Sequence, residues 1–500
     1  MKMHSTLTLV ITSAVWLGVV QAQAYPPSHY APLFPRNITM KLHHDKPNDN
    51  TTFQQLYQLT TEYFKPGGPI LFHQSEATTM VPITTNVFFD YAPQVHGILA
   101  GLEHRYFGSS FPEGESWDNV TDYSPLTLEN VLQDGVEFVN WIRRTVPGAE
   151  NSPVIYTAGS YGGFLAAQAR IRHPETFHAA LSTSPILTSF GSSTTAVDNS
   201  YKFTASDWLA QVYLDQSAEA SFKIKNALAE LERCIKVSNC QTAIPDLNLC
   251  TQPNSTEEWS SLLTHTIMQS YALIPQFNYG IKVIYDANAL QQLINATLAA
   301  KTVGEVLRAP IFVGNNALPN ASCADVASVT SGASITGEAW KYISCTYLVT
   351  SENAVSPSNP LFPAYEVNTP SNGCQNPAWE GPMYNWTNEE TVKYYSLTDR
   401  ELDSIERLLI VHGSNDRTTA VGNPDLSFSA NRNHSRVIVV EGLAHGDSVI
   451  SESVYPKGIR TQLDEIRETQ LNYVKEWIGF TGISSNATSA LTKRDISVFG

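Results

Sequence analysis

The stretch Pro153-Val154-Ile155-Tyr156-Thr157-Ala158-Gly159-Ser160-Tyr161-Gly162-Gly163 decides the fold of this chain. An apolar run of strand length leads into it, and a helical pattern over residues 164–172 follows it. A serine among small residues at a strand-to-helix turn is typical of a nucleophile elbow, because only small neighbours let the backbone bend so sharply. The alternative is an ordinary flexible Gly-Ser loop. We expect an α/β fold in which Ser160 stands at the carboxyl edge of a parallel sheet.

An elbow predicts an acid and then a histidine further along the chain, each just after a strand. Residues 407–412 form an apolar run that opens into a polar turn containing Asp416. Residues 436–441 are strongly β-branched and lead into a turn containing His445. We therefore expect Ser160 to attack the substrate, His445 to carry the proton and Asp416 to orient the imidazole.

Other residues compete for these roles. The chain has 13 histidines, and His445 is singled out by its place beyond a strand that follows a strand-plus-acid turn. Asp425 and Asp447 are alternative acids, but neither comes directly after a strand. The backbone amide of Tyr161, at the start of the helix, is the expected oxyanion donor, because a helix N-terminus favours negative charge.

The order of elements predicts one α/β core interrupted by a helical insertion. Strands are expected at 70–72, 95–102 and 154–157, and helices at 128–143, 205–233, 257–273 and 286–300. Alternation of strands and helices is typical of α/β proteins. The expected parts are a signal peptide (1–24), the first part of the core (25–193), a disulfide-bonded helical cap (194–390), the second part of the core (391–482) and a flexible tail (483–500).

The chain resembles the prolyl carboxypeptidase and dipeptidyl peptidase II family of serine peptidases, including its secreted fungal members. The matching segments are spread over most of the chain. They are residues 65–70, the Glu-His-Arg-Tyr-Phe-Gly-Ser-Ser run at 103–110, the elbow, 173–177, 182–185, 340–346 and the turns that carry Asp416 and His445. The resemblance implies an α/β-hydrolase core with helices on both faces of a mostly parallel sheet, a large helical cap, and cleavage after proline.

Four departures from the family pattern concern specificity. The usual Gly-Asn-Glu-Gly after the third strand is Gln-Ser-Glu-Ala at 74–77, which leaves the second oxyanion donor open. Arg417-Thr418 replaces Pro-Trp after the acid, so a proline preference is open too. His445-Gly446 replaces a His-His pair, and Tyr347 replaces a glutamate. The three expected catalytic residues are all retained.

Two further residues are candidates for substrate binding. Glu76 follows the third strand, where a substrate amine could sit, and its alternative is an ordinary loop acid. Trp340 could line the substrate pocket, with packing between cap and core as the alternative. We expect Glu103, His104 and Arg105 to form a structural ion-pair cluster behind the site.

The N-terminus and the cysteines indicate a secretory route. Lys2, the apolar residues 7–20 and the small residues of Ala22-Gln23-Ala24 form a signal-peptide pattern. An even number of cysteines in such a protein favours disulfides, and we expect Cys234 to pair with Cys240 or Cys250, and Cys345 with Cys374 or Cys323. Sequons for N-glycosylation occur at Asn37, Asn50, Asn119, Asn254, Asn295, Asn320, Asn385, Asn433 and Asn486.

The net charge and the apolar content of the chain limit the kinds of molecule that it can bind. The net charge of −16 argues against nucleic acid or an anionic membrane, and beyond the signal peptide no stretch has the roughly 20 apolar residues of a spanning helix. We expect peptide or protein substrates, no cofactor and no metal, with a homodimer left open. The acidic composition and the resemblance together favour acid-shifted activity, either outside the cell or in an acidic vacuole or lysosome-like compartment.

Three functions remain open at this point. The favoured one is an acid-active secreted serine peptidase of exopeptidase or proline-directed type. A secreted esterase or lipase would use the same elbow and partners, although the segments 103–110 and 340–346 argue against it. A catalytically silent glycoprotein of the same fold is the third.

Overall fold

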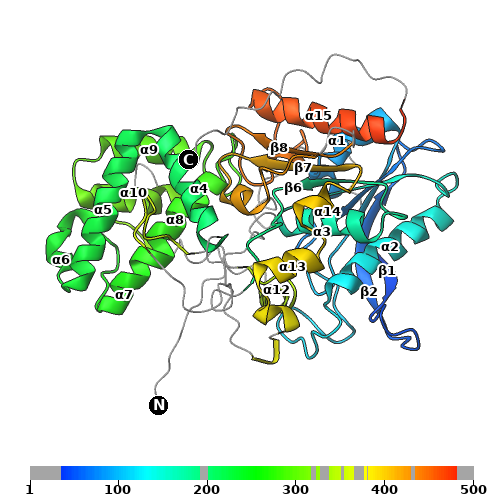
Figure 1. The fold of residues 1–500 in the computed structure, drawn as a ribbon, viewed down its shortest axis with the longest axis horizontal. Coiled ribbons are helices and arrows are strands. Elements are labelled where there is room, and N and C mark those ends of the chain that lie inside the picture. The colour runs from blue at the N-terminus through cyan, green and yellow to red at the C-terminus, as the bar shows by residue number, and fades with distance from the viewer. Residues whose placement is uncertain are drawn as a thin grey trace.

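A computed structural model describes residues 35–191, 201–316, 322–326, 337–350, 354–364, 377–379, 381–428 and 434–480. The expected signal peptide and C-terminal tail lie outside the described residues. Figure 1 shows a sheet with helices on both faces and, beside it, a group of helices from the middle of the chain.

The core is one eight-stranded sheet in the order β1-β2-β4-β3-β5-β6-β7-β8. Its strands are β1 (Arg36–Lys41), β2 (Thr52–Thr60), β3 (Ile70–Gln74), β4 (Ile98–Leu102), β5 (Val154–Gly159), β6 (Ala179–Thr183), β7 (Leu408–Gly413) and β8 (Arg436–Val440). The pairs β1–β2 and β2–β4 are antiparallel, and all pairs from β4 to β8 are parallel. This is the α/β-hydrolase fold that the sequence predicts.

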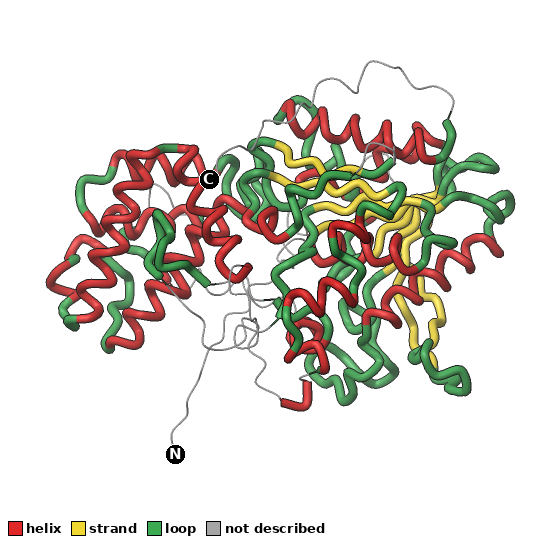
Figure 2. The backbone as a smooth tube through the Cα atoms, viewed as in Figure 1, coloured by secondary structure: helices red, strands yellow, loops and turns green. Residues whose placement is uncertain are grey.

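Helices cover both faces of the sheet, as Figure 2 shows. On one face lie α1 (Phe88–Val95) and α15 (Thr461–Trp477), and on the other α2 (Leu128–Thr145) and α3 (Ser160–Arg172). Alternate residues of β5 enter the two layers: Ile155 packs in the core with α1 and α15, and Tyr156 in the core with α2 and α3. β5 and β7 are buried on both faces and are nearly continuous apolar runs, so both could be predicted from the sequence.

The expected helical insertion contains α4 (Tyr201–Gln216), α5 (Ala218–Lys236), α6 (Cys240–Ala243), α7 (Thr256–Ser261), α8 (Gln269–Gln276), α9 (Ala289–Ala299) and α10 (Val303–Gly314). These helices form the group beside the sheet in Figure 1. The helix expected over 205–233 is two helices, because Ser217 caps the second by accepting a hydrogen bond from the amide of Ala220 at 3.1 Å. The sequence analysis did not anticipate α10, which contains Pro310.

Disulfides tie this helical group together. Cys234 is bonded to Cys240, and Cys250 to Cys323, which rules out the alternatives Cys234–Cys250 and Cys345–Cys323. Cys345 is also disulfide-bonded, and Cys374 lies outside the described residues. Further helices return the chain to the sheet: α12 (Gly337–Thr346), α13 (Asn388–Tyr394) and α14 (Asp399–Leu402).

One expected strand begins too early. The prediction of a strand over 95–102 was wrong at its start, because Val95 is the last residue of α1 and β4 begins at Ile98. His96 ends the helix in the left-handed conformation, with φ of 56°. Residues 95–98 therefore form a tight turn between a helix and a strand. Because both elements are apolar, the periodicity of the sequence does not show where the helix ends and the strand begins.

A buried ion pair fastens the β1–β2 hairpin to the core, and its partners differ from those that we expected. Arg105 binds Asp134 of α2 from Nε and Nη2 through two bonds of 2.7 Å, while its Nη1 donates to the carbonyls of Leu42 and Pro125 at 2.8 Å. Glu103, expected to pair with Arg105, instead accepts hydrogen bonds from neighbouring amides and a serine hydroxyl.

Replacing Asp134 with alanine should destabilise the protein by about 3–5 kcal/mol, because the fully buried Arg105 guanidinium would lose its counter-charge. Urea unfolding would measure the loss. Glu129→Ala is the control, since it removes the partly exposed pair with Arg172 and should cost less than about 1 kcal/mol. Equal effects of the two substitutions would contradict this account.

Candidate active site

Ser160 occupies a strained turn between β5 and α3. It is 2% exposed and has φ of 54°, a backbone conformation that residues other than glycine rarely adopt and that costs about 1–3 kcal/mol. Its hydroxyl oxygen makes no hydrogen bond within the described part of the chain. Strain of this kind is typical of a nucleophile elbow, so the local geometry agrees with the motif.

Close packing explains the two glycines that follow. A Cβ atom on Gly163 would lie 2.6 Å from the carbonyl oxygen of Thr183 on β6. A Cβ atom on Gly162 would lie 2.7 Å from both Ala158 Cβ and Glu76 Cγ. The N-terminus of α3 therefore comes so close to the sheet that neither position has room for a side chain.

Asp416 and His445 are hydrogen-bonded to each other. Nδ1 of His445 lies 2.7 Å from Oδ2 of Asp416, and both side chains are fully buried. Thr418 adds two hydrogen bonds to the carboxylate, from its amide at 2.9 Å and from its hydroxyl at 2.6 Å. Asp416 follows β7 and His445 follows β8, so the two turns meet at the carboxyl edge of the sheet.

The surroundings of Asp416 keep it ionised. Burial by itself raises the pKa of this carboxyl, but the charge of His445 and the hydrogen bonds from His445 and Thr418 outweigh that effect and lower the pKa below its ordinary value. An anion at this position stabilises an imidazolium and holds the proton of the neutral ring on Nδ1, which leaves Nε2 as the basic nitrogen.

Hydrogen bonds connect the turn that carries His445 to the end of β6, the strand that pairs with β5 beside Ser160. The amide of Gly446 donates to Ser184 Oγ at 3.0 Å, and the hydroxyls of Ser448 and Thr183 are 3.0 Å apart. Thr183 is in register with Gly159, the residue before Ser160. These bonds bring the histidine turn to the same strand ends as the elbow.

The helical insertion also contacts His445. The carbonyl of Gln276, at the end of α8, accepts a hydrogen bond from the His445 amide at 2.8 Å, and the Tyr279 hydroxyl donates to the His445 carbonyl at 2.8 Å. The Phe277 ring meets the imidazole edge-on at 5.9 Å. The sequence analysis missed these residues, because nothing in the local pattern of 276–279 indicates a contact with a turn so distant along the chain.

Tyr161 links the elbow to α12. Its hydroxyl lies 2.9 Å from Nε2 of His104 and 2.7 Å from the hydroxyl of Tyr347, and its ring meets the Trp340 ring at 5.3 Å. Tyr347, for which the resemblance implies a glutamate, thus binds the hydroxyl of a tyrosine. Trp340 is 5% exposed and packs beside the residue that follows Ser160.

Arg417 and Glu76 also occupy buried positions. Arg417, in place of the family's proline, is 5% exposed and donates from Nε to Oε1 of Gln276 at 3.2 Å. Glu76 is 2% exposed and lies against the elbow rather than in an open loop. Asp447, the alternative acid, accepts a hydrogen bond from the Ala444 amide at 2.8 Å, and its carboxylate lies 3.6 Å from the Arg460 guanidinium.

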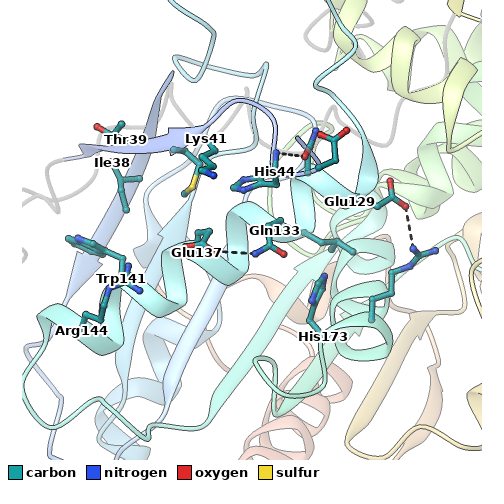
Figure 3. A pocket seen from close by; sticks show the side chains of 15 residues that line it. Ile38, Thr39, Lys41, His44, Glu129, Gln133, Glu137, Trp141, Arg144 and His173 are labelled. Carbon is teal, nitrogen blue, oxygen red and sulfur yellow. Dashed lines mark hydrogen bonds and ion pairs between the residues drawn. The ribbon is translucent and has the colours of Figure 1, made fainter. Parts of the chain in front are cut away.

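A separate cavity of about 700 Å³ lies far from these residues in the fold, on the outer side of α2 (Figure 3). Its walls come from β1, α2 and the end of α3, and include Lys41, His44, Glu137, Trp141 and His173. None of the residues predicted for catalysis or substrate binding lines it.

The described ranges contain no cluster of three His, Cys, Asp or Glu side chains that could hold a metal ion. In the same ranges, no helix has both the length and the apolarity needed to cross a bilayer.

Comparison with known proteins identifies relatives. The family model described as "Serine carboxypeptidase S28" matches residues 40–453. The lysosomal Pro-X carboxypeptidase of Bos taurus is 26% identical over 471 residues, which cover 89% of this chain and 87% of the relative. The serine protease vicPb of Bipolaris victoriae (strain FI3) is 33% identical over 141 residues, 26% of each chain.

Among solved structures, the proline iminopeptidase of Mycobacterium smegmatis has a TM-score of 0.38 and 12% identity, over 89% of this chain and 99% of that one. The match to the family model spans most of the chain, from β1 to the turn after His445. The chain therefore belongs to the serine carboxypeptidase S28 family and is a serine-type peptidase.

Proposed function

We propose that this peptidase hydrolyses peptide bonds with Ser160 as nucleophile, His445 as general base and acid, and Asp416 as the group that orients His445. The observation that carries the proposal is the buried 2.7 Å hydrogen bond between His445 Nδ1 and Asp416 Oδ2, at the strand ends that also hold the strained Ser160. The division of labour is that of a serine-histidine-aspartate triad.

In the proposed reaction, Ser160 Oγ forms a bond to the scissile carbonyl carbon while its proton passes to His445 Nε2. The carbonyl oxygen becomes an oxyanion, which the Tyr161 amide at the start of α3 stabilises. The C–N bond then breaks, and the proton on Nε2 goes to the departing amine. Water attacks the acyl-enzyme in the same way, releasing the new carboxyl end and restoring the Ser160 hydroxyl.

We propose that substrates are peptides cleaved near one end or after proline, at acid pH. Support comes from the family and from the Pro-X carboxypeptidase similarity over most of the chain. Contacts of Gln276 and Tyr279, in the helical insertion, with the backbone of His445 support restricted access to the proposed site. We propose 194–390 as the extent of this cap.

We also propose that the protein is a secreted or vacuolar/lysosomal glycoprotein. The N-terminal signal pattern and the disulfides support an oxidising route. The sequons within the described residues, at Asn37, Asn50, Asn119, Asn254, Asn295 and Asn385, all carry exposed asparagines, as attachment of a glycan requires.

A peptide panel tests the proposed activity. The peptides carry proline, alanine or leucine before the scissile bond, with free or blocked ends, and are assayed from acid to alkaline pH. We expect cleavage fastest at acid pH, and the preferred end and residue would define the type of peptidase. A profile that peaks above about pH 8 would contradict acid activity. Turnover of a simple ester without cleavage of any peptide would support an esterase instead.

A further inference from the structure

Glu76 is a buried acid that the proposed reaction leaves without a role. It comes two residues after the end of β3, and its side chain is 2% exposed. Oε1 accepts a hydrogen bond from the Gly159 amide at 3.2 Å. Oε2 is buried and has no hydrogen-bond partner among the described residues. A buried polar atom of this kind is costly, so its position needs an explanation.

The carboxyl group fits beneath the elbow on both sides of Ser160. A Cβ atom on Gly159 would lie 3.3 Å from Glu76 Oε1, and one on Gly162 would lie 2.7 Å from Glu76 Cγ. Ser160, which has φ of 54°, lies between these two contacts. Glu76 therefore holds the strained turn by one hydrogen bond and by packing, and the missing side chain of Gly162 makes room for it.

The surroundings of Glu76 favour a neutral carboxyl group. Burial raises its pKa to about 8, and the Gly159 hydrogen bond offsets only part of that effect. Tyr156 on β5 is the titratable group that faces it, and the pKa of this tyrosine is itself raised by burial and by Glu76. Among the described residues, no basic side chain forms an ion pair with Glu76.

We propose that Glu76 is a positioning residue whose protonated carboxyl group supports the nucleophile turn, and that loss of this proton inactivates the peptidase. The inference rests on the proposed assignment of Ser160 as nucleophile. It replaces the expectation that Glu76 binds a substrate amine, because a neutral carboxyl group offers no charge to an ammonium.

Two physical effects connect ionisation with loss of activity. A carboxylate without a counter-ion is unstable in a buried site, so the turn would shift to let water reach it. In addition, a negative charge next to the elbow repels the oxyanion that forms there in the transition state, which slows the chemical step more than it weakens substrate binding. Ionisation should thus lower kcat with little change in KM.

The test compares the wild type with Glu76→Gln, which keeps the shape and stays neutral. The measured quantities are kcat, KM and the rate of labelling by a fluorophosphonate probe, each against pH. One unit above a pKa of about 8, at about pH 9, the wild type should lose about tenfold in kcat and labelling, and Glu76→Gln should escape this loss while remaining active at acid pH. Glu76→Leu, also neutral, serves if the glutamine variant does not fold.

Asp90→Asn is the control, because Asp90 is a partly buried carboxyl whose pKa is also raised, to about 6, but it binds Ser451 and Glu452 instead of the elbow. Asp90→Asn should lose kcat and labelling at alkaline pH to the same extent as the wild type. The proposal would be overturned if kcat and labelling fell equally at alkaline pH in the wild type and Glu76→Gln. It would also be overturned if Glu76→Gln were equally impaired at every pH. If Ser160→Ala kept full activity, the assignment of the nucleophile would fail instead, so the two failures are distinguishable.

Discussion

Ser160→Ala should lower kcat by about 10⁴- to 10⁶-fold while leaving the protein folded. Alanine keeps the Cβ atom and therefore experiences the same backbone strain at φ of 54°. Only the hydroxyl is lost, and in the described structure this hydroxyl makes no hydrogen bond on which stability could depend. The loss should therefore appear in kcat and not in the free energy of unfolding.

The measurements are hydrolysis of the best peptide from the panel, fluorophosphonate labelling and urea unfolding. Ser152→Ala, in the loop before β5, is the control, because it removes another buried hydroxyl for which the described ranges offer no hydrogen-bond partner. It should retain wild-type activity. If Ser160→Ala kept its activity or its labelling, the nucleophile would be a different residue and the elbow would be a structural turn.

Asp416→Asn should reduce kcat by about 10⁴-fold. The asparagine fits the same space, but it has no charge to stabilise the imidazolium. Its amide group can also present a donor to Nδ1 of His445, which would move the ring proton to Nε2 and leave no basic nitrogen for Ser160. Substrate binding should change little, because Asp416 is fully buried and contacts His445 and Thr418.

Asp447→Asn provides the comparison, since Asp447 is the other buried acid in the histidine turn and binds Ala444 and Arg460 instead of the imidazole. We expect it to affect stability more than kcat. Steady-state kinetics of both variants, with urea unfolding, would separate the two roles. A greater loss of kcat in Asp447→Asn than in Asp416→Asn would assign the acid to Asp447.

Elements with a strong local pattern were predicted well. The runs that became β5 and β7 were recognised because these strands are buried on both faces and read as continuous apolar sequence. The run that became β8, a partly buried edge strand, was recognised by its β-branched residues. The sequence analysis did not anticipate β6, whose residues Ala-Ala-Leu-Ser-Thr are short and mostly small. Its place between β5 and β7 follows from pairing with both neighbours, which is information outside the segment.

The same distinction holds at the active site. The positions of Ser160, Asp416 and His445 were predicted because each follows a strand, and the ends of parallel strands meet at one edge of a sheet. Contacts made across the fold were not predicted. They include the bonds from Gln276 and Tyr279 to His445, and the packing of Glu76 against Gly162.

The sequence by itself determined the α/β core, the elbow, and the order of serine, acid and histidine, because these depend on local patterns of apolar and small residues. Only the tertiary structure decided which groups surround them. Glu76 illustrates the difference: its sequence neighbours make it an ordinary loop acid, whereas burial under the elbow raises its pKa to about 8. A charge state depends on solvent and on neighbours brought together by folding, and neither is written in the adjacent residues.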